Sequence, residues 1–176
     1  MKTPGILDEI ALVLFNLEVA EDFYLMRLEV PRIAAQVVPG QFVEVRGSEG
    51  VSPFLRIPLS VCHCDREEGT VDLLYEDMGS KSHLLSQLKP GHEPACLGPL
   101  GNGFRIPPAD RRPVMVGGGI GVPPLLFMGE TMQRAGHRVT LLVGARWGKK
   151  HLPDTMLRAA SHKAHKATDD GSLGHH

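Results

Sequence analysis

A run of glycines is the stretch of this sequence whose residue types could bind a charged ligand. Four glycines lie within residues 117–121, between the apolar run 114–116 and Pro123-Pro124. Proline suits the first turn of a helix, so the pattern predicts a strand, a tight turn and a helix. Glycines let a ligand approach the backbone, and free N–H groups at a helix start favour an anion such as a pyrophosphate. A turn whose glycines serve packing alone is the alternative, and no Lys follows the last glycine as in a GxxxxGK[ST] loop.

The three cysteines are a second candidate for chemistry. Cys62 and Cys64 flank His63 in a segment that is typical of a strand, so their thiols are expected to share one face. A metal site needs further ligands at set spacing, and only the distant Cys96 and scattered histidines are available. An odd number of cysteines argues against a disulfide framework. We therefore expect buried thiols that act as small apolar side chains, and no metal site.

Composition limits the classes of protein to consider. The chain has 176 residues, enough for one large or two small domains, and is 42% hydrophobic and 22% charged. Its net charge is −1 and its basic residues are scattered, which argues against a nucleic-acid partner. The apolar run 10–15 is too short to span a bilayer and follows Asp8 and Glu9 instead of basic residues. We expect a cytoplasmic protein with no membrane partner.

The first hundred residues have the pattern of short strands. A helix of one or two turns is expected at 83–89, before Pro90-Gly91. The predicted strands are 9–17, 22–30, 41–46, 59–64, 71–75 and 95–97. About six short strands at this spacing favour an antiparallel β-barrel over a βαβ array.

The hydrophobic period changes after Arg105, where Ile106-Pro107-Pro108 forms a stiff connector. We place a domain boundary near residue 110, which gives a barrel domain at 1–108 and an α/β domain at 109–176. The second part is short for a full nucleotide-binding sheet. The predicted fold class is therefore an antiparallel β-barrel followed by an incomplete α/β nucleotide-binding domain.

The α/β part begins with one strand–helix–strand unit. It consists of the strand 114–116, a helix from about 123 to 135 with Gly136 as its C′ residue, and a strand at 139–143. Such a crossover implies parallel strands. A second helix is predicted at 154–160.

Taken together, these segments resemble a known family. GPLGNGF (98–104) and VGGGIGVPPL (116–125) are similar to the electron-transfer subunit of the bacterial NAD-dependent dihydroorotate dehydrogenase, in the ferredoxin reductase-like superfamily. PGQFVEV (39–45), LRIPLSV (55–61) and TDDGSLG (168–174) fall in the family's order. The resemblance covers nearly the whole chain. It implies a barrel that holds FAD and an α/β domain that binds NAD(H).

The resemblance also implies a function. Hydride passes between nicotinamide and flavin, and full-length members then pass electrons through a [2Fe–2S] cluster to an FMN-containing catalytic dehydrogenase subunit in a hetero-oligomer. That partner interconverts dihydroorotate and orotate in pyrimidine biosynthesis. The cofactors carry the redox chemistry, so the resemblance implies an oxidoreductase subunit without a catalytic side chain of its own.

The C-terminal end departs from the family pattern. Members carry a C-x₄-C-x₂-C…C stretch after the nucleotide domain, and three cysteines in the barrel cannot replace it. We expect no iron–sulfur cluster on this chain, which looks C-terminally truncated. An incomplete parallel sheet leaves uncovered faces, so we expect the barrel to be firmly folded and the second half to be mobile, partner-dependent or aggregation-prone.

On the flavin side, the resemblance points to two segments. Ile57 stands where the family usually has Arg, so either a bend lets Arg56 substitute or phosphate binding is weakened. Lys81-Ser82 stands where the family has Gly-Thr. The implied flavin-binding residues are Arg56, Ile57, Pro58, Leu59, Ser60, Leu74, Tyr75, Glu76, Lys81 and Ser82.

On the nucleotide side, residues 98–104 are expected to form a wall, and 169–172 to follow a later strand. At the end of the second parallel strand, where an acid often grips the ribose, the sequence has Gly144-Ala145-Arg146. Arg146 suits a 2′-phosphate, so a preference for NAD over NADP comes from the resemblance alone. The residues implied to face the pyrophosphate are Gly117, Gly118, Gly119, Ile120 and Gly121.

Two other functions fit the same residues. A reductase subunit that serves ferredoxin, glutamate synthase or a hydrogenase would share the flavin and nucleotide sites. A non-catalytic barrel that lost its redox centres would explain Ile57, Lys81 and the missing cysteines.

Overall fold

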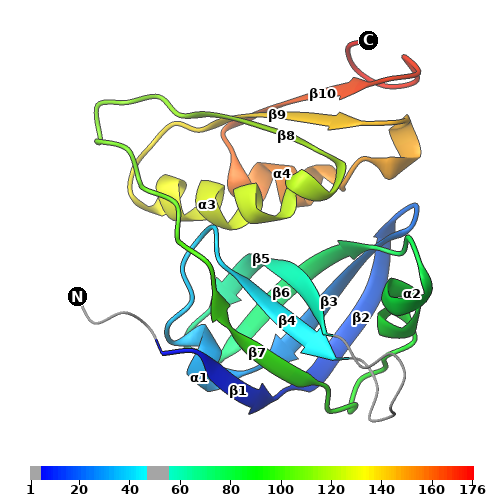
Figure 1. The fold of residues 1–176 in the computed structure, drawn as a ribbon. Helices are drawn as coiled ribbons and strands as arrows, with labels where there is room; N and C mark the ends of the chain where they lie inside the picture. The colour runs from blue at the N-terminus through cyan, green and yellow to red at the C-terminus, as the bar shows by residue number, and fades with distance from the viewer. Residues whose placement is uncertain (1–4, 47–55) are drawn as a thin grey trace.

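The computed structural model describes residues 5–46 and 56–176. They form a seven-stranded antiparallel sheet and a three-stranded parallel sheet. In Figure 1 the antiparallel sheet curls into a half-barrel, and helices α3 and α4 lie between it and the parallel sheet. The predicted succession of an antiparallel barrel and a small α/β part is confirmed.

The curled sheet contains every described strand before residue 101, in the order β1-β7-β4-β5-β6-β3-β2. Two short helices accompany it, α1 (Pro31–Ala34) and α2 (Ser80–Ser86). Its strands are β1 (Leu7–Ile10), β2 (Leu12–Ala20), β3 (Phe23–Glu29), β4 (Phe42–Arg46), β5 (Ile57–Asp65), β6 (Thr70–Glu76) and β7 (Ala95–Leu100).

One predicted strand is in fact two. Residues 9–17 divide at Ala11, which is buried and whose N–H donates to the carbonyl of Pro94 at 2.9 Å. The chain thereby pairs with β7 before this point and with β3 after it. The sheet has seven strands for this reason, against about six expected.

The parallel sheet has the order β10-β9-β8. Its strands are β8 (Val114–Gly118), β9 (Thr140–Ala145) and β10 (Lys163–Thr168), and its helices are α3 (Pro123–Arg134) and α4 (Asp154–Ala160). Gly136 has φ +87°, the left-handed conformation expected of a C′ glycine. The predicted parallel crossover and both helices are confirmed, and β10 is the later strand that residues 169–172 were expected to follow, although its bounds were not predicted.

The two sheets share a hydrophobic core. α3 packs on β5, and barrel residues Phe23, Cys62 and Leu74 join the cluster formed by α3, α4 and the parallel strands. The proposed domain boundary near residue 110 lies in the β7–β8 connection and stays a prediction. None of the helices in residues 5–46 and 56–176 is long and apolar enough to cross a membrane.

The cysteines are free and buried, as expected, but they do not share a face. A register shift between Val61 and His63 places a bulge at Cys62. Cys62 consequently packs between the two sheets, and Cys64 packs inside the barrel. Burial raises the pKa of Cys64 to about 11 and that of Cys96 to about 12, which keeps these thiols protonated.

Candidate functional site

A pocket of about 390 Å³ lies at the carboxyl ends of the three parallel strands. One wall is formed where β8, β9 and β10 end, and the opposite wall comes from the barrel. Its lining residues are Phe23, Glu76, Met78, Gly118, Gly119, Ile120, Gly144, Ala145, Arg146, Lys150 and Asp169. This edge is where open α/β sheets bind their ligands, because the loops after the strands converge there.

The glycine turn exposes its backbone to this pocket. Gly119 has φ +50°, and a Cβ added there or at Gly121 would meet no atom within 4 Å. At Gly118 the nearest atom to an added Cβ is the carbonyl oxygen of Gly144, 3.9 Å away. Gly117 is different, because its Cβ would lie 2.8 Å from Leu125 Cδ1. Ligand approach and packing therefore both explain glycines here, at different positions.

Helix α3 begins directly after this turn. Its first residue is Pro123, and no side chain caps its N-terminus. Pro123 and Pro124 have no N–H. The amides of Leu125 and Leu126 donate to the carbonyl of Val122 at 2.9 and 3.3 Å. An anion beside this turn would therefore be favoured by the helix dipole and not by free amides of the first helical turn. The local structure thus suits the pyrophosphate that the sequence predicts.

Glu76 is the predicted flavin-side residue that lines the pocket, and it is paired. Its Oε1 lies 2.6 Å from Lys150 Nζ, which also contacts Asp22 Oδ2 at 2.9 Å. Burial lowers the pKa of Lys150, but its hydrogen bonds to the two carboxylates outweigh burial and leave that pKa raised. The ammonium is therefore charged at neutral pH.

The β5 residues divide between the two faces of the strand. Ile57 packs against the barrel core and Leu59 is buried in it, whereas Pro58 is exposed and Ser60 half-buried. Arg56 precedes the strand, and its Nη2 lies 2.7 and 3.0 Å from the two carboxylate oxygens of Asp8. A flavin phosphate at Arg56 would compete with this ion pair, so a role for Arg56 in binding stays a prediction.

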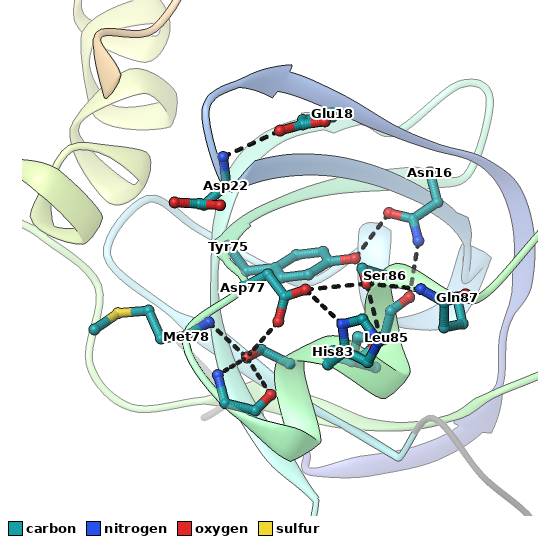
Figure 2. A network of polar contacts seen from close by, with 12 residues as sticks. Asn16, Glu18, Asp22, Tyr75, Asp77, Met78, His83, Leu85, Ser86 and Gln87 are labelled. Atoms are coloured by element: carbon teal, nitrogen blue, oxygen red, sulfur yellow. Dashed lines mark hydrogen bonds and ion pairs between the residues drawn. The ribbon is translucent and has the colours of Figure 1, made fainter. Parts of the chain in front are cut away.

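The side chains of Leu74 and Tyr75 are buried. The Tyr75 hydroxyl donates to Asn16 Oδ1 at 2.9 Å, and Asn16 Nδ2 donates to the carbonyl of Leu85 at 2.8 Å (Figure 2). Asn16 Nδ2 also donates to the carbonyl of Leu88 at 3.1 Å. Burial raises the pKa of Tyr75. These two side chains hold α2 and the core in place, so any contact with a cofactor would involve their main chain.

Ser82 serves as a local cap. Its Oγ accepts hydrogen bonds from the amides of Met78 and Gly79 at 2.9 and 3.0 Å, and lies 3.2 Å from Asp77 Oδ1 (Figure 2). The neighbouring Lys81 is half-exposed. The hydroxyl expected to meet the flavin is therefore already used in holding the start of α2.

The pocket also contains residues that the sequence does not predict. Phe23, Met78 and Lys150 line it, whereas residues 98–104 do not belong to its lining. Phe104 instead lies against Gly40, where an added Cβ would be 2.9 Å from the Phe104 ring. Lys150 could have been found, because it follows the second parallel strand at the edge where sites form. Phe23 carries no such signal in the sequence.

The chain is similar in sequence to the electron transfer subunits of one dehydrogenase. It is 39% identical over 158 residues to the electron transfer subunit of dihydroorotate dehydrogenase B (NAD(+)) from Geobacillus kaustophilus, a match that covers 89% of this chain and 61% of that protein. The corresponding subunit from Desulforamulus reducens is also 39% identical, over 89% of this chain and 60% of the relative. The chain is a homologue of these electron transfer subunits.

The chain spans about three fifths of the length of the curated relatives it matches. No protein-family model matches it. The NADH-dependent reduced ferredoxin-NADP oxidoreductase structure superposes with a TM-score of 0.81 and 28% identity, over 95% of this chain and 59% of the other.

More distant solved structures share the fold. The Neisseria gonorrhoeae ferredoxin NADP+ reductase with bound FAD and NADP has a TM-score of 0.74 at 19% identity, over 92% of this chain and 68% of the reductase. The fold is thus ferredoxin reductase-like. Within residues 5–46 and 56–176, no three His, Cys, Asp or Glu side chains are grouped to hold a metal ion.

Proposed function

We propose that this chain is the FAD- and NAD(H)-binding part of an electron-transfer flavoprotein that works with a catalytic dehydrogenase subunit. The observation that carries the proposal is the pocket between the exposed glycine turn and the barrel wall. Gly118 and Gly119 line one side of it, and Phe23 and Met78 line the other. The names of the homologous subunits support dihydroorotate dehydrogenase B as the complex. In this proposal the catalytic partner contains FMN and forms orotate as the oxidised product.

The residues present fit the dinucleotide. Open space beside the turn glycines leaves room for a pyrophosphate against the backbone, and Asp169 and Arg146 stand at the neighbouring strand ends. The flavin supplies the chemistry that links hydride transfer to single-electron transfer. In this proposal the chain itself binds, orients and shields the two cofactors, and no side chain donates or abstracts a proton.

The proposed flavin contacts come from the barrel. Pro58 and Ser60 are available on the outer side of β5, and the proposed contacts of Leu74 and Tyr75 are main-chain contacts. Lys81 and Ser82 lie at the start of α2, where a phosphate would have to share the hydroxyl of Ser82 with the helix cap. Ile57 packs on the core, so any phosphate contact at this place falls to Arg56.

A visible absorption spectrum tests the proposal. The purified chain is incubated with FAD, freed of unbound flavin and scanned, and NADH is then added without oxygen. We expect retained flavin absorption that NADH bleaches. A chain that stays colourless after FAD treatment would instead be the non-catalytic barrel module.

A second function is favoured by one observation. The similarity to the NADH-dependent reduced ferredoxin-NADP oxidoreductase is high in structure, with a TM-score of 0.81. A reductase subunit that serves ferredoxin or another electron-carrier enzyme would use the same pocket. Co-purification separates the two functions, since a dihydroorotate-oxidising partner supports the first and a ferredoxin-linked partner the second.

A further inference from the structure

A short segment after β9 reaches the barrel and holds the tip of the β2–β3 hairpin. Trp147 Nε1 donates to Glu21 Oε2 at 2.8 Å, and the Glu21 amide donates to the carbonyl of Lys149 at 3.1 Å. Lys150 Nζ contacts Asp22 Oδ2 at 2.9 Å and Glu76 Oε1 at 2.6 Å. We call these six residues the clasp: Glu21, Asp22, Glu76, Trp147, Lys149 and Lys150.

Lys150 is the centre of the clasp. Its side chain is only 9% exposed, and its ammonium lies 5.2 Å from the ring centroid of Trp147 and 5.7 Å from that of Phe23. Two carboxylates face this single positive charge, so the group as a whole is negative. Lys150 is therefore committed to the barrel and is unsuited to recruit a phosphate.

The clasp stands in the wall of the candidate pocket. Lys150, Glu76 and Phe23 line the same pocket as Gly118 and Gly119. Hydride transfer needs reacting atoms about 3–3.5 Å apart, and a misplacement of about 1 Å can cost about a hundredfold in rate. If one cofactor is held by each sheet, the placement of the sheets relative to each other decides this separation.

We propose that Lys150 is a positioning residue for electron transfer, which fixes the nucleotide-binding edge of the parallel sheet against the barrel by joining Glu76 and Asp22. Its ion pairs are made to the protein and none to the reacting atoms. The inference rests on the function proposed above for the pocket.

The first test uses the full chain loaded with FAD and mixed rapidly with NADH. In Lys150→Met we expect the rate constant of flavin reduction at saturating NADH to fall at least about tenfold. The Kd for NADH should change less than about threefold, because the glycine turn is untouched. Glu76→Gln should act in the same way, and Lys150→Arg should restore most of the rate because it keeps the charge. Lys163→Met, at an exposed lysine that starts β10, is the matched control.

The second test needs no cofactor. Trp147 is the only tryptophan of the chain, so its fluorescence reports on the clasp. In Lys150→Met the indole of Trp147 loses the ammonium that lies over its ring and becomes more exposed to water. We therefore expect its emission at longer wavelength and stronger quenching by acrylamide. Lys163→Met should leave both unchanged.

The results of these two tests support or overturn the positioning role of Lys150. A wild-type flavoprotein that NADH does not reduce overturns the proposed function and the positioning role with it. A Lys150→Met protein that is reduced at the wild-type rate overturns the inference alone. Weaker NADH binding at an unchanged rate constant would make Lys150 a ligand for the nucleotide, against the proposal. Unchanged Trp147 fluorescence would show that Lys150 does not hold the clasp.

Discussion

At the scale of single residues, the crossing of α3 and α4 depends on the lack of a side chain at position 129. A Cβ on Gly129 would overlap the carbonyl oxygen of Ala160 and lie 3.0 Å from Met115 Cε. Alanine would gain up to about 1 kcal/mol of helix propensity, but overpacking against a backbone atom costs about 1–3 kcal/mol. We therefore expect Gly129→Ala to lower the free energy of unfolding by about 1–2 kcal/mol in denaturant titrations.

Gly79→Ala is the control for this substitution. An added Cβ at Gly79 meets nothing within 4 Å, so its free energy of unfolding should stay within about 0.5 kcal/mol of wild type. Equal stability of both variants would contradict the described crossing.

A second residue-scale contact makes stability depend on pH. His63 Nδ1 lies 2.6 Å from Glu130 Oε2, and this hydrogen bond, against the effect of burial, raises the pKa of His63. Asp72 also raises that pKa and Arg27 lowers it. A His whose pKa is raised in the folded state stabilises the fold fully at pH values below its ordinary pKa of about 6.5. This stabilisation is lost as the pH rises through the folded-state pKa.

We expect Glu130→Gln to reveal this linkage. The difference in free energy of unfolding between wild type and the variant should be largest near pH 5.5 and shrink towards about pH 8.5. The exposed Glu67 gives the control Glu67→Gln. A difference that grows with pH would mean that the ion pair does not form.

At the scale of elements, the sequence predicted the helices well, because their positions depend on residues close together in the chain. The helical period after Pro123 and the glycine at 136 placed α3 almost to the residue, and α4 was placed at 154–160 as observed. The bounds of β10 were not predicted, because KAHKAT has no apolar run, and only the resemblance indicated a strand before residue 169. β10 is a strand because all six of its residues lie in register beside β9. Such long-range pairing leaves little trace in the strand's own sequence.

The pocket residues could likewise be predicted only in part, because some of them come together only through long-range contacts. The glycine turn and the strand ends were predictable, since their residues follow each strand in sequence. Lys150 and Glu76 come from distant parts of the chain, and only folding brings them within 2.6 Å. The bulge at Cys62, which turned one thiol to the other face, is likewise a property of pairing with β6.

The strand–turn–helix element carries a binding prediction. Gly118 has extended backbone, with φ −122°, which valine adopts easily, so Gly118→Val should leave the free energy of unfolding within about 0.5 kcal/mol. Its side chain would occupy the pocket and keep an anion off the backbone. Loss of one hydrogen bond to a charged group is worth about 1.5–3 kcal/mol, so we expect NADH affinity to fall about ten- to hundredfold by calorimetry. Binding at wild-type affinity would contradict the assignment of the turn.

At the scale of the whole molecule, the residues that the structure describes cover the parallel sheet on one face only. α3 and α4 lie on the side of the barrel, whereas Val114 and Val116 on the other face of β8 are 61% and 71% exposed (Figure 1). Parallel sheets are normally buried on both faces, and β8 is also an edge strand. Exposed apolar side chains on such a strand favour self-association.

Replacing both valines by threonine keeps the β-branched shape and adds a hydroxyl that water can satisfy. We expect Val114→Thr/Val116→Thr to unfold within about 1 kcal/mol of wild type, to bind less of a hydrophobic dye and to scatter less light at high concentration. Met115 lies between them and is 8% exposed on the covered face, so Met115→Ala should cost about 2–5 kcal/mol. A double threonine variant as unstable as Met115→Ala would show that the exposed face is buried in solution by association of the chain with itself.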